Sequence, residues 1–194
     1  MNTDLQVILR NILDDVRVEL NDEFDRNFER QAFFSEAWQR RRSPVSGSRS
    51  GHLLVDTGRL RRSIISRIEG GSITFLSTEP YAALHNEGGS IKVTRKMKKF
   101  FWHKFYETTG AFSRVKGKGA KRNVHRTLNT QQSKTSPEAA FWRWMALKKE
   151  GSEIKIPRRR FIGYSPEVQR SVREIIEENL QQFFDTYNII NPQP

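Results

Sequence analysis

Apolar residues recur every three or four positions over the first part of the chain. The repeat consists of Leu5, Ile8, Ile12, Val16, Leu20, Phe24 and Phe28. This spacing produces one apolar stripe along a helix, and Thr3 is a suitable N-cap for it. The pattern predicts a long N-terminal helix over residues 3–38, or two consecutive helices, with a break at Ser43-Pro44.

The next part of the chain is typical of short antiparallel strands. β-prone runs lie on both sides of Gly70-Gly71, which predicts a hairpin near residues 62–77. The alternation along this hairpin mixes polar and apolar positions, so it leaves the register open. Turns are expected on either side of the hairpin, at residues 56–58 and 81–89. Short strands are expected farther along the chain, at residues 90–93 and 153–156.

Helical patterns return after these strands, and each begins with a capping residue. Thr94 precedes a basic, aromatic helix that Gly110 ends. Ser136-Pro137 starts a second helix that runs to Gly151, and Ser165-Pro166 starts a strongly amphipathic last helix. Residues 111–135 are poor in apolar side chains, which predicts a mobile basic loop.

Together these elements predict an α+β fold. One small antiparallel sheet is expected, built from the hairpin and the two short strands and packed by the long N-terminal helix, two middle helices and the C-terminal helix. The 194 residues fit a single domain spanning 1–194. The apolar fraction of 36%, with 13 Phe and 4 Trp, is enough for a hydrophobic core.

Composition excludes several classes of protein. The chain has no Cys, so neither disulfides nor thiolate metal sites are expected. It has no apolar run long enough for a transmembrane helix, and its start lacks the order of a signal peptide. A cytosolic origin fits these observations.

Positive charge is concentrated in the middle of the chain. The net charge is +12, and residues 92–126 hold 12 basic side chains and 1 acidic one. Residues 1–40 hold 5 basic and 9 acidic side chains, and residues 164–194 hold 2 and 5. This asymmetry suits a polyanionic partner or an oligomer in which acidic and basic faces of neighbours meet. A solvated basic loop is the alternative.

A catalytic or metal centre is not apparent among the chemistry-bearing residues. His85-Asn86-Glu87 is superficially similar to a nuclease fragment, but no second motif histidine or metal-ligand spacing follows. His85 is therefore expected to cap or hydrogen-bond a turn. Phosphate-binding loops and nucleophile elbows are absent too. The pattern predicts a protein that is not an enzyme and needs no cofactor.

Nonspecific nucleic-acid binding by residues 92–126 is the alternative function. Phosphate contacts need Lys and Arg, and aromatic residues are interleaved with them here. A helix with an apolar inner side and a basic outer side explains the same pattern. The residues proposed to contact DNA or a partner are Lys96, Lys98, Lys99, Lys116, Lys118, Lys121 and Arg122.

Three sequence motifs in order resemble one known family. They are LVDTGRLRRSI at residues 54–64, YAALHNEGG at residues 81–89 and IPRRRFIG at residues 156–163. The set resembles the phage virion-morphogenesis or tail-completion proteins of long-tailed phages and prophages. Arg160 departs from the proline usual there, and residues 94–151 form an aromatic, basic insert.

The resemblance implies a structural protein of virion assembly. Proteins of this family are similar to small α+β subunits that form rings, often sixfold, which complete the tail or join it to the head. The implied partners are further copies, tail-tube proteins and head-connector proteins, with possible nonspecific contact to double-stranded DNA and no membrane. The implied location is the virion, after synthesis in the bacterial host cytoplasm.

The motif residues then have roles in holding the fold. Glycines permit tight turns, Pro157 stops a strand, Phe161 anchors the chain before the last helix, and Arg159 pairs with an acid of the same or the adjacent subunit. The full set is Thr57, Gly58, Leu60, Ser63, Tyr81, His85, Gly88, Gly89, Pro157, Arg159, Phe161 and Gly163.

Overall fold

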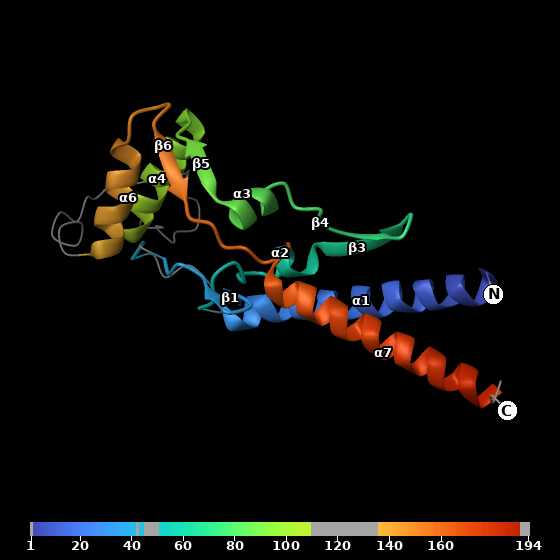
Figure 1. Ribbon diagram of the computed structural model, residues 1–194. Coiled ribbons are helices and arrows are strands. Elements are labelled where there is room, and N and C mark those ends of the chain that lie inside the picture. Colours follow the sequence, from blue (N-terminus) through green and yellow to red (C-terminus); the bar gives the residue numbers. More distant parts are fainter. Residues whose placement is uncertain (1, 42, 45–50, 110–135, 191–194) are drawn as a thin grey trace, which may run out of the picture. The chain divides into compact units, whose positions relative to one another are not determined.

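A computed structural model describes residues 2–41, 43–44, 51–109 and 136–190 (Figure 1). The chain divides into two compact units. Unit 1 comprises residues 1–39, 48–88 and 157–194, and unit 2 comprises residues 40–47 and 89–156. The prediction of one domain over residues 1–194 stays a prediction.

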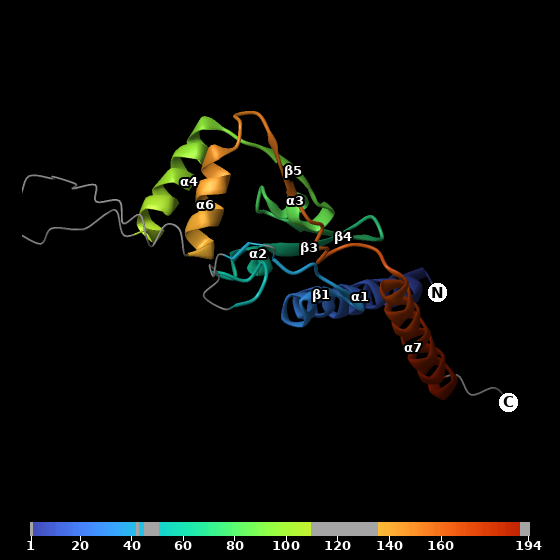
Figure 2. The same ribbon diagram turned by 90° about the vertical axis from the view of Figure 1, so that its left-hand side faces the viewer.

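Two long helices and a hairpin build unit 1. Helix α1 (Asn2–Arg30) and helix α7 (Pro166–Ile190) lie side by side and run in opposite directions (Figures 1 and 2). Their contact buries one core cluster, which also includes Phe33 from the segment after α1. The buried members of this cluster are Val16, Leu20, Phe24, Phe33 and Val168.

Helix α1 differs from its prediction at both ends. Thr3 already lies inside the helix, so it is not the N-cap. The helix ends at Arg30, and strands β1 (Ala32–Phe33) and β2 (Glu36–Ala37) form a short hairpin where helix was expected. Gln31 and Phe34 adopt left-handed backbone conformations, with φ of 57° and 51°. Because an α-helix does not continue through such residues, the apolar stripe stops being helical there.

The predicted hairpin is present as strands β3 (Ile64–Glu69) and β4 (Ser72–Ser77). Its register pairs Ser66 with Phe75, which settles what the alternation of the sequence left open. Phe75 packs edge-on against Phe24 of α1, with ring centroids 5.0 Å apart. Asn21 of α1 also donates a hydrogen bond to Ser66 Oγ at 2.8 Å. The face that carries Ser66 and Phe75 therefore lies on α1.

Two short helices occur that the sequence did not predict. Helix α2 (Arg59–Arg62) follows the turn at Gly58, and helix α3 (Ala82–Glu87) occupies most of the segment expected to be an apolar turn. Each buries one small apolar surface, through Leu60 and Ala82, respectively. Helices this short give too little periodicity to be recognised in a sequence.

Unit 2 contains a strand pair and two helices. Strand β5 (Gly89–Lys92) pairs with strand β6 (Glu153–Ile156), and helix α4 (Arg95–Thr108) packs on helix α6 (Pro137–Leu147). One core cluster of this unit has Phe101, Met145 and Ala146 as its buried members. Thr94 and Ser136 accept hydrogen bonds at the starts of the two helices as expected. Helix α6 ends before the predicted Gly151, whereas Gly110 and the loop 111–135 lie outside the described residues.

The predicted α+β class is confirmed. The prediction of one small sheet is wrong, because the strands of the described residues form separate two-stranded sheets, β1-β2, β3-β4 and β5-β6.

Candidate functional site

The three sequence motifs meet around Phe161 in unit 1. The Phe161 side chain has no solvent exposure, and its ring centroid lies 5.2 Å from that of Phe28. Leu60 comes from the first motif, Ala82 from the second and Phe161 from the third, and Trp38 completes the cluster. We call this cluster the Phe161 junction; its buried members are Phe28, Trp38, Leu60, Ala82 and Phe161.

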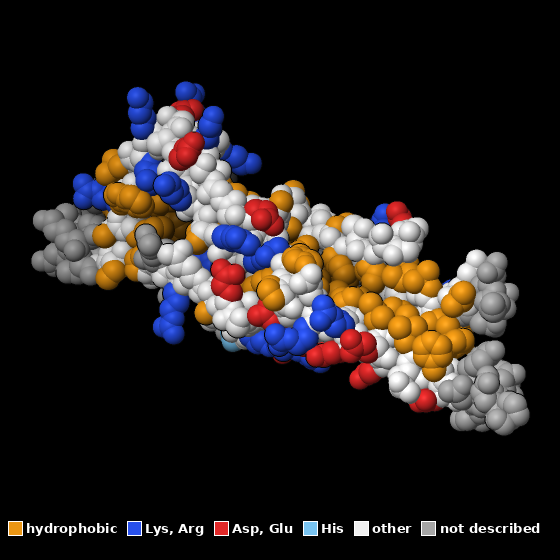
Figure 3. All heavy atoms as spheres, viewed as in Figure 1, with side chains coloured by type: hydrophobic (Ala, Val, Ile, Leu, Met, Phe, Trp, Pro, Cys, Tyr) orange, Lys and Arg blue, Asp and Glu red, His pale blue; other side chains and the backbone are white. Residues whose placement is uncertain are grey.

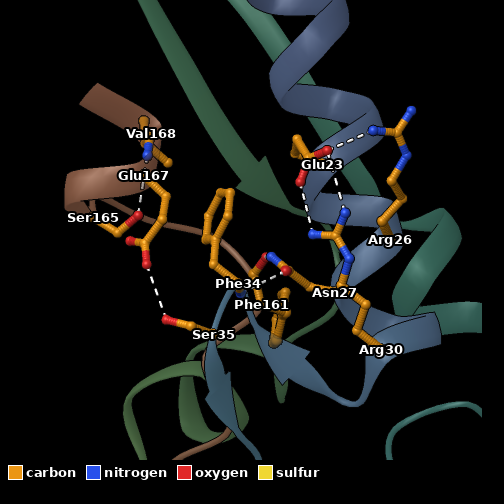
Figure 4. Close-up of polar contacts among 10 residues, drawn as sticks. All are labelled: Glu23, Arg26, Asn27, Arg30, Phe34, Ser35, Phe161, Ser165, Glu167 and Val168. Atoms are coloured by element: carbon orange, nitrogen blue, oxygen red, sulfur yellow. Dashed lines mark hydrogen bonds and ion pairs between the residues drawn. The ribbon is translucent and has the colours of Figure 1, made fainter. Parts of the chain in front are cut away.

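Two asparagine side chains bind the backbone of Phe161. Asn27, which has no solvent exposure, donates from Nδ2 to the Phe161 carbonyl at 3.2 Å and accepts from Phe34 N–H at 2.9 Å (Figure 4). Asn86 accepts at Oδ1 from the N–H groups of Phe161 and Ile162, at 2.9 and 3.1 Å. Buried backbone groups outside regular structure need such partners. The two asparagines thus supply hydrogen-bond partners for the backbone of a segment that is neither helix nor strand.

Neighbouring residues of the third motif are held in the same way. The indole nitrogen of Trp38 donates to the carbonyl oxygen of Arg160 at 2.6 Å. Arg159 N–H donates to the carbonyl oxygen of His85 at 2.8 Å, and Arg159 Nε donates to the carbonyl oxygen of Gln39 at 3.0 Å. Arg159 is buried, so it acts as a support inside this unit. Its predicted pairing with an acid stays a prediction.

Gly88 is required by the close approach of the second and third motifs. Its φ is +75°, and a Cβ at this position would lie 2.9 Å from the backbone nitrogen of Arg158. Gly58 has a φ of +71° at the start of α2, where a Cβ would meet only the end of the Arg62 side chain. Glycine is therefore required at position 88 because a side chain would clash with the backbone, whereas at position 58 it is required by the backbone conformation.

Polar groups of the first motif close its turn. Arg62 Nη2 donates to the carbonyl oxygen of Thr57 at 2.9 Å. The Ser63 hydroxyl lies 2.7 Å from the carbonyl oxygen of Leu60, to which it donates, and 2.6 Å from the hydroxyl of Ser77. Arg61 reaches α1, where it donates to Asp25 and, at 2.7 Å, to Glu29. These two carboxylates raise the pKa of Arg61.

The remaining motif residues mark the ends of elements. Tyr81 stands at the N-cap of α3 and is partly exposed, Gly89 begins β5, Pro157 directly follows β6, and Gly163 has a φ of +137° beside the Arg160 side chain. The predicted roles of Pro157 and Phe161 stay predictions. The other motif residues surround the Phe161 junction or the turns that lead to it.

His85 does not have the surroundings of a catalytic base. Its ring is half-buried against Tyr81, with centroids 6.0 Å apart, and Nδ1 is buried without a hydrogen-bond partner. Burial lowers the pKa of His85, and the charge of Arg159 lowers it further. A neutral, packed imidazole is the result. Within the described ranges, no group of three or more metal-ligating side chains occurs.

The last helix begins with a capping network next to the junction. Ser165 Oγ accepts from Val168 N–H at 3.2 Å, and Ser35 donates to Glu167 at 3.0 Å (Figure 4). A backbone hydrogen bond at Glu167 itself and then Ser35 lower the pKa of that carboxyl. A negative charge in the first turn is favourable for the helix dipole. The network fixes where α7 starts.

A second feature of unit 1 is an apolar groove between α1 and α7. The groove has a volume of about 640 Å³, and hydrophobic side chains gather along it in Figure 3. Leu9 lines it and is 52% exposed. Other lining residues come from α1, β4 and α7, namely Ile12, Leu13, Val16, Phe75, Val172 and Ile176. We call this feature the α1–α7 groove.

The predicted basic contact residues are only partly described. Lys96 and Lys99 are exposed on α4, and Lys98 is half-buried. Phe101 and Phe105 are buried on the opposite side of the same helix, as the interpretation of an apolar inner face required. Lys116, Lys118, Lys121 and Arg122 lie outside the described residues.

Sequence reasoning missed the roles of the two asparagines. Asn27 lies between Phe24 and Phe28 on the apolar stripe of α1. A polar residue on a buried helix face needs a hydrogen-bond partner inside the protein, so this position was a detectable signal. No local pattern indicates that its partner would be Phe161.

Comparison with known proteins identifies the chain's relatives at the level of a family. The model of the phage virion morphogenesis family matches residues 4–181. Neither a curated protein nor a solved structure matches the chain. No described helix is long and apolar enough to cross a membrane. The match covers all three motifs, α1 from residue 4 onward and α7 as far as residue 181, and the chain therefore belongs to the phage virion morphogenesis family, whose role is structural, in phage assembly.

Proposed function

We propose that this chain is a non-enzymatic subunit of a homo-oligomeric ring that completes the phage tail or joins it to the head. In this proposal it is made in the host cytoplasm and ends in the virion. Its partners are further copies, tail-tube proteins and head-connector proteins. The proposal makes the Phe161 junction a structural support and assigns recognition to the exposed surfaces.

The observation that carries the proposal is the α1–α7 groove. Apolar surface exposed to water is unfavourable by roughly 25 cal/mol per Å², and large contiguous patches mark interaction sites in soluble proteins. The exposed apolar side chains here lie on the two longest helices, and they include Leu5, Leu9, Leu180 and Phe184. In a family of virion assembly proteins, such a surface is expected to be covered in the assembled particle.

The proposal is tested with the purified chain and with the phage that encodes it. We expect light scattering and negative-stain images to show rings, alone or on the end of the tail tube. Deletion of the gene should give separate heads and tails, or tails of abnormal length, and expression in trans should restore joined virions. Joined, infectious virions at wild-type yield without the gene would contradict the proposal.

Nonspecific contact with double-stranded DNA is a second candidate. It is favoured by Lys92, Arg95, Lys96 and Lys99, which are exposed at the end of β5 and on the first turns of α4. If these residues neutralise phosphates, binding should weaken steeply with salt, with a slope of about −0.9 per contact in log K against log salt. Changing Lys96 and Lys99 to Gln should then flatten the slope, whereas Arg170→Gln on α7 should not.

A further inference from the structure

The α1–α7 groove continues along the outer side of α7. A second hollow of about 490 Å³ shares Val168, Val172 and Ile176 with it and is also lined by Arg173 and Glu177. Past the groove, Leu180 and Phe184 follow Ile176 at intervals of four residues and are 38% and 54% exposed. Residues four apart lie on one face of a helix, so the apolar surface extends along α7.

The two helices that form this apolar surface carry a net negative charge. Helices α1 and α7 together hold 13 acidic and 6 basic residues, a net charge of −7. Glu174, Glu177 and Glu178 are exposed on α7, and Asp15 of α1 accepts a hydrogen bond from Asn179 of α7 at 2.9 Å. An apolar groove between helices of net negative charge favours an apolar partner surface flanked by basic residues.

Unit 2 carries such a surface on the outer side of α6. Trp144 and Leu147 are 58% and 62% exposed, and the Nζ of Lys148 lies 4.0 Å from the centre of the Trp144 ring. Ala140 and Arg143 are also exposed on this side. We call these residues the α6 strip: Ala140, Arg143, Trp144 and Leu147. Over residues 89–109 and 136–156, unit 2 holds 10 basic and 4 acidic side chains, a net charge of +6.

Resting on the proposed ring function, we propose that the α6 strip of one copy docks into the α1–α7 groove of the next copy. The groove volume of about 640 Å³ falls within the roughly 300 to 1,000 Å³ typical of pockets that bury most of a ligand, so it accommodates an indole and an adjacent leucine. The opposite charges of the two surfaces favour this pairing over the pairing of two grooves.

This pairing has a geometric consequence. The donor strip and the acceptor groove are different surfaces of the same chain, so the contact is heterologous. Heterologous contacts repeat from copy to copy and generate a ring when the rotation closes. Every subunit in such a ring uses both of its surfaces.

The test uses two variants that each remove one surface. Trp144→Ser/Leu147→Ser removes the α6 strip, and Leu9→Arg places a charge in the groove. Both change exposed side chains, so folding is expected to persist and is checked by circular dichroism. Matched controls are Phe100→Ser in unit 2 and Val18→Arg on α1, since these residues are 50% and 55% exposed and lie outside both surfaces.

In sedimentation velocity, each surface variant should raise the apparent Kd of assembly about tenfold or more, as central aromatic and apolar contacts usually do. The controls should assemble like the unmodified chain. An equimolar mixture of the two variants should form a one-to-one dimer and nothing larger. The strip variant keeps its groove and the groove variant keeps its strip, so each pair of chains has one working contact. Glu177→Lys/Glu178→Lys should weaken assembly, and Lys148→Glu/Lys149→Glu should restore it.

Other outcomes are distinguishable. An unmodified chain that stays monomeric even with tail tubes overturns the ring function itself. If rings still form with both surface variants, only this docking is overturned. If the groove variant disrupts assembly and the strip variant does not, the docking is also overturned, and the result indicates that two grooves pair with each other. Strip variants that lose affinity for duplex DNA with unchanged assembly assign the α6 strip to nucleic acid instead.

Discussion

Asn27 and Asn86 bind opposite sides of one backbone residue: Asn27 donates to the Phe161 carbonyl, and Asn86 accepts from the Phe161 N–H. One asparagine lies on α1 and the other on α3. The extended segment that carries Phe161 has no strand partner of its own, so these side chains take the place of a sheet ladder. The Phe161 junction therefore depends on polar contacts as well as on apolar packing.

Replacing Asn27 by Ala should destabilise the protein by about 2–4 kcal/mol, because two buried backbone groups lose their partners. The measurement is urea unfolding followed by circular dichroism. Asn11→Ala is the matched control, since Asn11 is exposed on the same helix, and it should change stability by less than about 0.5 kcal/mol. Equal effects of the two variants would show that the hydrogen bonds of Asn27 contribute nothing.

Asn86→Ala should be destabilising to a similar degree, about 2–4 kcal/mol, since its Oδ1 accepts two hydrogen bonds. Because both asparagines hold Phe161, the double variant should lose less than the sum of the single losses. Additive losses in the same unfolding experiment would mean that the two contacts act independently.

Gly88→Ala should destabilise more than Gly70→Ala. Both glycines have positive φ, of +75° and +56°, and a left-handed conformation costs a residue with a Cβ about 1–2 kcal/mol. Only at Gly88 does the new methyl group meet backbone, at 2.9 Å from Arg158 N, whereas nothing lies within 4 Å at Gly70. Thermal unfolding of both variants measures the difference, and equal losses would exclude a steric requirement at position 88.

His85 should make stability depend on pH in one direction. Burial and the nearby Arg159 lower the pKa of His85 in the folded state from its ordinary 6.5, so the unfolded chain takes up the proton first. The stability that the neutral His85 contributes to the folded state is fully present above about pH 6.5. It is lost as the pH falls through that value to the lower folded-state pKa.

The measurement compares His85→Phe with the unmodified chain between pH 5 and pH 8. The unmodified chain should lose stability relative to the variant as the pH falls. If the stability of His85→Phe changed with pH in the same way as that of the unmodified chain, another group would be responsible for the pH dependence.

Arg61→Lys should weaken the contact between α2 and α1 by up to about 1 kcal/mol, because lysine keeps the charge but not the fork that binds Asp25 through two nitrogens. Both partners are partly exposed, at 28% and 47% of their side chains, so high salt should reduce the effect. Arg59→Lys, at a 72% exposed side chain paired with Glu79, should cost less. A double-mutant cycle with Asp25→Asn isolates the pair.

Local chemistry made much of the fold predictable. Thr94 and Ser136 each accept a hydrogen bond at the helix starts that the sequence predicts, and β5 and β6 lie within one residue of their expected positions. Caps and short β-prone runs are properties of a few adjacent residues. The sequence therefore contains all the information needed to find them.

Tertiary contacts decided the rest. The apolar stripe past Arg30 belongs to a small hairpin because Gln31 binds Leu53, donating to its carbonyl at 3.2 Å and accepting from its N–H at 2.5 Å. No glycine or proline marks that change of conformation. In the same way, the motifs identified the segments of the Phe161 junction, but the position of Asn27 beside Phe161 depends on the packing of residues far apart in the chain.

Strands β5 and β6 give unit 2 a further property. Gly89 and Ile156 are paired across the two strands, so the segment 89–156 leaves and returns at neighbouring points. Segments with adjoining ends tolerate replacement, because the chain on either side keeps its path. Replacing residues 89–156 by a short turn should therefore leave the path of the chain on either side, from Gly88 and into Pro157, unchanged, while removing the α6 strip.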